Sequence, residues 1–210
     1  MRTLTLIQGS PEWHAPRAKA RNASDAPAML GCSPYQTRTQ LLTALHTGIR
    51  PEPTREQQVR FDAGHAIEAA QRPFAEEVIG EDLYPVVGCE VVDGIELSAS
   101  FDGLTMLEDQ VYECKTLNDT LRQAFDDIAT IAPEYREEAG GKCLPEMYRA
   151  QMEQQLAVCG GRRVLFVAAT KDGSDVRPCW DYPHPAMRAK LIAGWQELDR
   201  NPRTRAIVAA

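Results

Sequence analysis

The pattern of apolar and polar residues predicts alternating blocks of helices and strands. In residues 57–79, apolar side chains recur at helical spacing, which predicts one long helix. Further helices are expected at residues 10–21, 24–30, 37–47, 121–131, 145–159 and 185–199. Short apolar runs predict strands at residues 86–92, 95–101, 110–115, 163–170 and 177–182. This order predicts a mixed α/β (α+β) domain with a central sheet flanked by helices.

Two connections carry turn signals of their own. Asp93-Gly94 separates two predicted strands and is a strong hairpin signal. Residues 133–144 are polar and contain Gly140-Gly141, so we expect a mobile loop there.

Two predicted helices place polar residues at or beside an apolar face. In the long helix, Phe61, Ile67 and Val78 are expected to face the core, and Glu68 borders that stripe. Glu68 is either an edge residue or a carboxylate directed into a cleft. In the helix at 145–159, Gln151 and Gln155 lie one turn apart within the apolar face. They are either hydrogen-bonded core amides or a polar pair that lines a cleft.

Length and composition are those of an ordinary globular protein, and we expect a single domain over residues 1–210. No apolar run approaches the roughly 18 residues of a membrane span, and the N-terminal apolar stretch is too short for a signal peptide. We therefore expect a cytoplasmic protein without a membrane partner. The six cysteines are spread too widely for a zinc ribbon, a redox pair or an iron–sulfur motif. The net charge of −7 argues against a protein that coats DNA, although carboxylates that bind metal are compatible with a nuclease.

The candidate chemistry lies on two adjacent predicted strands. Side chains on a strand alternate between its faces, so Glu113 and Lys115 point to one face and Cys114 to the other. Asp102 ends the preceding strand and can lie beside them. Two convergent carboxylates suit a hard cation, and a nearby lysine can hold a water or a phosphate oxygen. Such a group can cleave a phosphodiester, although a Glu and a Lys two residues apart are more often a solvated face.

The order Glu68, Asp102, Glu113-x-Lys115 and Gln151 resembles the restriction-endonuclease-like PD-(D/E)xK nucleases. More closely, it resembles the phage lambda exonuclease and YqaJ-type viral recombinase family, over roughly residues 10–170. The runs that carry the likeness are Trp13-His14 with Arg17, Ala23-Ser24, Gly64-His65-Ala66-Ile67-Glu68, Ser100-Phe101-Asp102-Gly103, Glu113-Cys114-Lys115 and Tyr148-Arg149-Ala150-Gln151. One departure is that Phe101 replaces the proline of the "PD" signature.

The resemblance implies a site for Mg²⁺, with two ions expected and Mn²⁺ as a possible substitute. Asp102, Glu113 and the backbone carbonyl of Cys114 would hold one ion through oxygen ligands. Glu68 would help to bind the second ion, directly or through water. Two ions would stabilise both the attacking and the leaving oxygen.

The resemblance also assigns roles to four other residues. Lys115 would orient or deprotonate the attacking water, and Gln151 would help to position Lys115 or the scissile group. Arg17 and Ser24 match positions that capture the 5′-terminal phosphate of the digested strand, and the start of a helix at Ser24 would favour an anion. Without the resemblance, Ser24 is more simply interpreted as a plain helix N-cap, and the two roles are compatible.

The implied activity is 5′→3′ exonuclease digestion of one strand of linear double-stranded DNA, which leaves 3′ overhangs for phage-type recombination. A ring-shaped homotrimer, a prophage origin and a single-strand annealing partner are further expectations of the resemblance. Three alternatives stay open: a structure-specific or RecB-like endonuclease of the same fold, a DNA-end-binding subunit that does not cleave, and a small-molecule phosphohydrolase.

Overall fold

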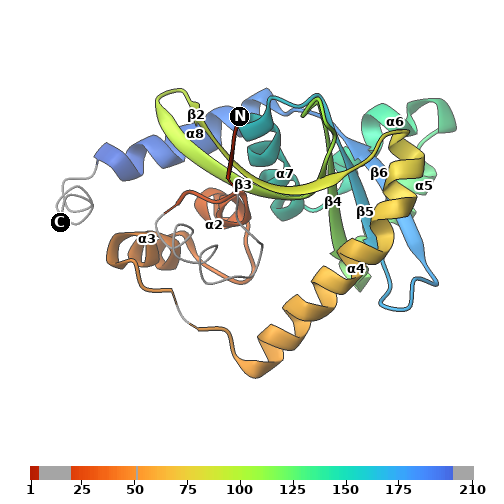
Figure 1. The fold of residues 1–210 in the computed structure, drawn as a ribbon, viewed down its shortest axis with the longest axis horizontal. Coiled ribbons are helices and arrows are strands. Elements are labelled where there is room, and N and C mark those ends of the chain that lie inside the picture. The colour runs from red at the N-terminus through yellow and green to blue at the C-terminus, as the bar shows by residue number, and fades with distance from the viewer. Residues whose placement is uncertain (5–19, 51, 201–210) are drawn as a thin grey trace.

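A computed structural model describes residues 1–4, 20–50 and 52–200 of the chain. Six strands form one sheet in the order β1-β2-β3-β4-β5-β6 (Figure 1). The strands are β1 (Arg2–Leu4), β2 (Tyr84–Val92), β3 (Ile95–Leu104), β4 (Gln110–Thr116), β5 (Arg163–Ala169) and β6 (Val176–Asp181). Neighbouring strands are antiparallel except β4 and β5, which are parallel. The predicted mixed sheet flanked by helices is confirmed.

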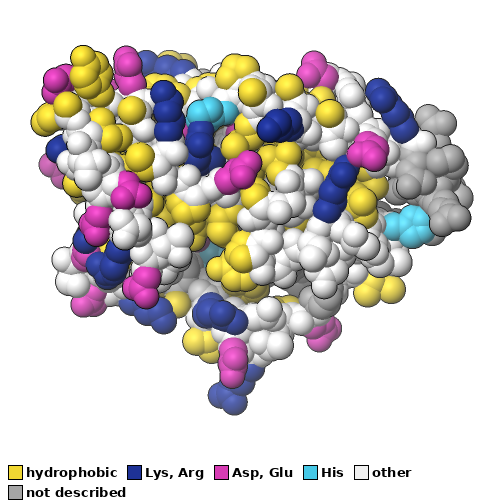
Figure 2. Space-filling model, turned by 180° about the vertical axis from the view of Figure 1, so that it is seen from behind, with side chains coloured by type: hydrophobic (Ala, Val, Ile, Leu, Met, Phe, Trp, Pro, Cys, Tyr) yellow, Lys and Arg dark blue, Asp and Glu magenta, His cyan; other side chains and the backbone are white. Residues whose placement is uncertain are grey.

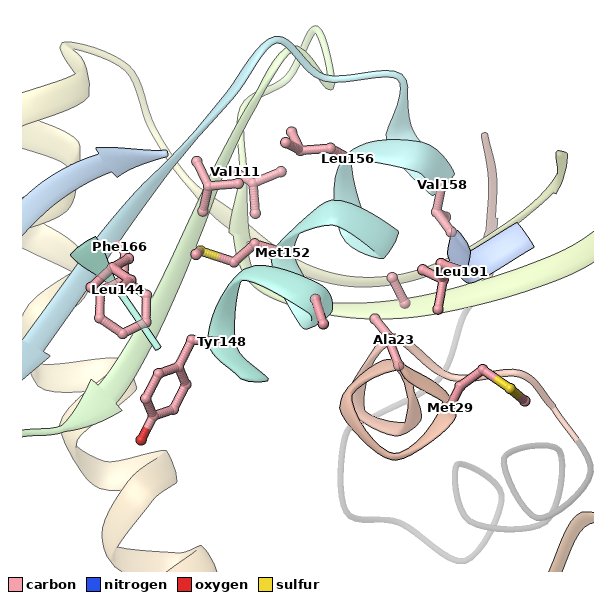
Figure 3. Close-up of a cluster of buried hydrophobic side chains, with 14 of the residues drawn as sticks. Ala23, Met29, Val111, Leu144, Tyr148, Met152, Leu156, Val158, Phe166 and Leu191 are labelled. Atoms are coloured by element: carbon pink, nitrogen blue, oxygen red, sulfur yellow. The ribbon is translucent and has the colours of Figure 1, made fainter. Parts of the chain in front are cut away.

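Helices lie on both faces of the sheet. They are α2 (Ala26–Leu30), α3 (Arg38–Thr47), α4 (Arg55–Ile79), α5 (Asp119–Thr130), α6 (Arg136–Ala139), α7 (Glu146–Cys159) and α8 (Pro185–Arg200). Alternate residues of β5 belong to two separate hydrophobic clusters, since Phe166 packs with α7 and α5 whereas Leu165 packs with α4. Figure 3 shows the larger cluster, in which Tyr148 and Met152 of α7 lie near Phe166 of β5 and Val111 of β4. The sheet is therefore enclosed between α7 and α4.

Local sequence accounts for the ends of these elements. Thr54 begins α4 with a capping box, in which its hydroxyl accepts from the Gln57 N–H and the Gln57 side chain accepts from the Thr54 N–H. Gly80 ends the helix in the left-handed region, with φ of 82°. Asp93 and Gly94 both have positive φ, 49° and 80°, as the two central residues of a type I′ hairpin turn require. The predicted hairpin between β2 and β3 is confirmed.

The orientation predicted for the long helix is wrong over its first half and at its C-terminal end. Phe61 is 53% exposed and Val78 is 40% exposed, whereas Ile67 and Ala75 are buried against the sheet. The N-terminal half of α4 projects away from the sheet in Figure 1. The helical period continues beyond the part of α4 that reaches the sheet, so periodicity alone overestimates the buried face.

The segment 133–144, predicted to be a loop, instead consists of short helical elements. The segment forms two 3₁₀ turns, Pro133–Tyr135 and Gly140–Cys143, on either side of α6. Gly141 is buried against β6, and a Cβ there would come within 2.4 Å of the Asp181 Oδ1 atom. A glycine fits at this position because any larger side chain would clash with Asp181 of β6. Strand β1 has no counterpart among the predicted elements, and the helix predicted at 10–21 lies mostly outside the described residues.

Within the described ranges, no helix combines the length and the apolar character that crossing a membrane requires.

Candidate active site

The site forms where the ladder between β3 and β4 ends. The two strands are paired at Gly103↔Tyr112 and Leu104↔Val111. One residue further, the carboxylate of Asp102 accepts a hydrogen bond from the backbone N–H of Cys114 at 2.9 Å. A side chain thus replaces the next backbone contact. This arrangement places the Asp102 carboxylate beside the Glu-Cys-Lys run of β4, as the sequence predicts.

Glu113 lies on the face of β4 that packs against α7, and it is 2% exposed. Its Oε1 atom accepts hydrogen bonds from Lys115 Nζ and from Gln151 Nε2, the latter at 2.6 Å. Its Oε2 atom accepts a hydrogen bond from Gln155 Nε2 at 2.6 Å. Three donors therefore fix both carboxylate oxygens. Burial of an acidic group is tolerated when its oxygens are paired in this way.

The alternation predicted along β4 is confirmed. Lys115 lies on the same face as Glu113 and pairs with it. Cys114 packs on the opposite face with Ile67 of α4 and Leu165 of β5. Burial raises the pKa of the Cys114 thiol to about 12, so the side chain stays neutral.

Lys115 keeps its positive charge in this environment. Burial by itself would lower the pKa of the Lys115 ammonium, but the negative charges of Glu113 and Asp102 outweigh burial and raise it. The side chain as a whole remains 27% exposed. A positive charge therefore lies in direct contact with the buried carboxylate of Glu113.

Glu68 lies on α4, which packs on the opposite face of the sheet from α7. It lies half-buried on α4, and the Tyr112 hydroxyl donates to its backbone carbonyl at 3.0 Å. Burial raises the pKa of Glu68, Lys115 lowers it, and Glu113 raises it again. The pKa of Asp102, which is 7% exposed, is raised well above its usual range by burial and then by the charges of Glu113 and Glu68. The three carboxylates are therefore close enough to repel one another.

Arg72 belongs to the same surroundings and was not predicted from the sequence. It lies one turn after Glu68 on α4, and its Nε atom donates to the backbone carbonyl of Asp102 at 3.2 Å. The spacing of four residues from Glu68 on one helix face was the available signal.

The donor set fits a hard divalent cation of the Mg²⁺ type. Asp102 and Glu113 offer carboxylate oxygens, and their negative charge, together with that of Glu68, is only partly balanced by Lys115 and by Arg72. Among the residues that the structure describes, no His, Cys, Asp and Glu side chains form a group of three or more placed to enclose a metal. Mg²⁺ is usually held by one or two carboxylates, with water and substrate phosphate supplying the other ligands. The residues present therefore fit such an ion.

Gln151 and Gln155 of α7 both donate to the carboxylate of Glu113. Gln151 was predicted to position Lys115 or the scissile group, and the structure places its amide on Glu113 Oε1, the atom that Lys115 also contacts. Gln155 was left open between a core amide and a cleft-lining residue. It is fully buried and donates to the other oxygen of Glu113.

The two residues predicted to bind the terminal phosphate are Arg17 and Ser24. Arg17 lies outside the described residues. Ser24 is exposed within a single 3₁₀ turn, Ala23–Asp25, whose N-cap is Asn22. A helix does begin here, as the sequence predicts, but the N-cap of α2 is Asp25, one residue after Ser24. Asn22 forms a bridge with Ser98, so this segment lies beside β3, the strand that carries Asp102.

The fold and site together define a nuclease-like class: a mixed sheet whose adjacent strands carry Asp102 and Glu113-x-Lys115, with helices that add Glu68 and Gln151. This is the restriction-endonuclease-like fold with a PD-(D/E)xK arrangement. The family described as the YqaJ-like viral recombinase domain matches residues 12–162, and the chain belongs to this family.

Exonucleases are among the solved structures with a similar fold. An alkaline exonuclease from Laribacter hongkongensis is similar at 19% identity and a TM-score of 0.64, over 90% of this chain and 93% of that chain. The same enzyme in complex with dAMP aligns at 22% identity and a TM-score of 0.63, over the same 90% and 93%. A phage-related exonuclease from Haemophilus somnus 129PT aligns at 10% identity and a TM-score of 0.52, over 94% and 99%. The search of curated proteins found no match.

Proposed function

We propose that this protein is a Mg²⁺-dependent 5′→3′ exonuclease, which digests one strand of linear double-stranded DNA and leaves 3′ overhangs for phage-type recombination. The observation that carries the proposal is the convergence of Asp102, Glu113 and Lys115 where the β3–β4 ladder ends. Membership of the viral recombinase family and the exonuclease fold support it.

In this proposal, Asp102 and Glu113 hold the metal, together with the backbone carbonyl of Cys114, and Glu68 assists at a second ion. The bound metal would polarise the scissile phosphate and stabilise charge on the attacking and leaving oxygens. Lys115 orients the attacking water and offsets the negative charge that develops on the phosphate. Water oxygen bonds to phosphorus, the bond from phosphorus to the 3′ oxygen breaks, and the 3′ oxygen takes up a proton. Each step leaves a new 5′-phosphate on the shortened strand.

The substrate end is the second part of the proposal. Arg17 and Ser24 would bind the 5′-terminal phosphate, which distinguishes the digested strand from its partner. The dAMP held by the Laribacter exonuclease is a mononucleotide, the class of product that stepwise digestion would release.

A homotrimer would help an acidic chain to hold DNA. On the face shown in Figure 2, Lys and Arg side chains are interspersed with Asp and Glu and form no continuous basic patch. Basic residues contributed by three subunits to one channel would concentrate positive charge along the DNA track. A single-strand annealing protein is the expected partner for the exposed 3′ strand.

The test of the proposed function compares three duplex DNA substrates of equal length. These are a linear duplex with 5′-phosphates, a linear duplex with 5′-hydroxyls and a covalently closed circle, each incubated with Mg²⁺ or with EDTA. We expect rapid loss of the 5′-phosphorylated strand from its 5′ end, slower loss with 5′-hydroxyl ends, and no cleavage of the circle or in EDTA. Nicking of the circle would show that the protein is an endonuclease and not an exonuclease. Tight binding without any cleavage would instead indicate a DNA-end-binding subunit.

Replacing Arg17 with alanine tests the phosphate pocket. We expect the preference for 5′-phosphorylated over 5′-hydroxyl ends to fall by about 10- to 100-fold, because a charged hydrogen-bonding partner contributes about 1.5–3 kcal/mol. The initial rates on both end types provide the measurement. Arg162, which is exposed and pairs with Asp109, offers a matched control as Arg162→Ala. Equal losses on both end types in the Arg17 variant would contradict a phosphate pocket there.

A further inference from the structure

Gln155 makes a contact that spans the gap between β3 and β4. Its side chain is completely buried on α7. The Nε2 atom donates to the backbone carbonyl of Ser100 on β3 at 3.1 Å and to Glu113 Oε2 on β4 at 2.6 Å. One amide group therefore joins the two strands just beyond the last backbone pair of their ladder, Gly103↔Tyr112.

A second side chain bridges the same gap. The Asp102 carboxylate accepts from the Cys114 N–H, so a residue of β3 holds the backbone of β4. Gln155 adds a connection from the α7 side, because the side chain of Glu113 points toward α7. The separation between the two strands, and with it the separation of the Asp102 and Glu113 carboxylates, depends on both contacts.

The neighbouring Gln154 shows what a purely structural amide looks like in this helix. It is equally buried, and both ends of its amide are paired. Its Nε2 atom donates to the carbonyls of Arg21 at 2.7 Å and Ser98 at 3.2 Å, and its Oε1 atom accepts from Trp195 Nε1 at 3.0 Å. Gln154 does not contact Glu113 in these hydrogen bonds.

Gln155 uses only one end of its amide. Its Oε1 atom is buried, and no donor among the described residues reaches it. An unpaired buried acceptor is costly, so a core amide retained for stability would be expected to have both ends paired. The opposite amide orientation would place Oε1 against the carboxylate of Glu113, where two acceptors would face each other. The hydrogen bonds from Nε2 to Glu113 and to the Ser100 carbonyl therefore explain why a glutamine is buried at this position.

We propose that Gln155 is a positioning residue for the metal site: by fixing Glu113 Oε2 and the β3–β4 separation, it holds the two carboxylates ready for a divalent cation. This inference rests on the proposed function, since it concerns the metal that the nuclease would use. It assigns a second glutamine of α7 to the site, in addition to Gln151.

The test compares Gln155→Met with Gln154→Met, two substitutions of equal size at equally buried neighbouring positions. Binding of Mn²⁺ to each protein is measured without DNA, by titration calorimetry or by the electron paramagnetic resonance signal of free Mn²⁺. The Mg²⁺ concentration that gives half-maximal cleavage is measured in parallel, and thermal unfolding reports the stability of each variant. Gln155→Asn is a further variant, which keeps the amide but is one methylene too short to reach Glu113.

We expect Gln155→Met and Gln155→Asn to bind Mn²⁺ about 10- to 100-fold more weakly, as is usual when a group that orients a metal ligand is removed. The Mg²⁺ requirement for cleavage should rise by a similar factor. Gln154→Met should lower the melting temperature, because it removes the partner of the Trp195 N–H and two hydrogen bonds to backbone carbonyls, yet keep the Mn²⁺ affinity of the wild type.

Two results would overturn the inference, and only one of them would also overturn the proposed function. If the wild type binds Mn²⁺ and cleaves DNA, and the folded Gln155 variants keep its Mn²⁺ affinity, then Gln155 has no positioning role while the proposed function stands. If the wild type neither binds Mn²⁺ nor cleaves DNA, the proposed function fails and the inference fails with it.

Discussion

The Glu113→Gln variant is expected to lose cleavage of linear duplex DNA by about three orders of magnitude or more, while DNA binding stays measurable. Glu113 is one of two buried carboxylates at the end of the β3–β4 ladder, and its oxygens accept from Lys115, Gln151 and Gln155. A neutral amide keeps the size but removes the charge that would bind the metal. A metal contributes several kcal/mol of charge stabilisation, and about 1.36 kcal/mol corresponds to a tenfold rate change.

The measurement is the initial rate of strand loss in Mg²⁺, with binding to the same DNA followed in Ca²⁺ or EDTA. Glu77→Gln is a matched control, because Glu77 is an exposed carboxylate on α4. It should cleave at the rate of the wild type. Unchanged cleavage by a folded Glu113→Gln variant would remove this metal site from the mechanism.

The Lys115→Met variant is expected to lower kcat by about 10²–10⁴-fold, since a positioned group that transfers protons or stabilises charge contributes about this much. The Lys115 ammonium pairs with Glu113 and keeps its charge because the surrounding carboxylates raise its pKa. Methionine preserves much of the aliphatic length and removes the charge. The effect should appear in kcat, with a much smaller change in KM for DNA, because the charge acts mainly as the phosphate reacts.

Steady-state rates over a range of DNA concentrations separate these two parameters. Lys142→Met is the matched control, because Lys142 is exposed at the end of a 3₁₀ turn. That variant should match the wild type in kcat. If Lys115→Met instead raised KM and left kcat unchanged, Lys115 would be a DNA-binding residue without a part in the chemical step.

The site could be predicted from local pattern because strand geometry decides most of it. The two-residue period of β4 places Glu113 and Lys115 on one face and Cys114 on the other, whatever the rest of the fold does. The Asp93-Gly94 pair likewise has positive φ at both positions. Asp-Gly adopts this conformation readily, and it is the conformation that a two-residue hairpin turn requires. The contact between Asp102 and the Cys114 N–H depends on where the ladder ends, which no local pattern reveals.

Other features depend on partners that are distant in sequence. Strand β1 forms only by pairing with β2, some 85 residues later, as the register Arg2↔Cys89 shows. Gly141 is small because Asp181 lies against it, so a glycine that looked like a loop signal marks close packing. Gln155 carried a usable signal, one turn from Gln151 on the same helix face. That Gln155 donates to Glu113 Oε2 could be learned only from the three-dimensional structure.

Anomalous diffraction from manganese can show whether Asp102 and Glu113 bind the catalytic metal, as we propose. Crystals of the wild-type protein are grown with Mn²⁺, and diffraction data are collected at wavelengths on either side of the manganese absorption edge. We expect an anomalous peak in contact with the carboxylates of Asp102 and Glu113, and the loss of that peak in Glu113→Gln. Anomalous peaks only at other positions, from crystals of a protein that cleaves DNA in Mn²⁺, would contradict the proposal.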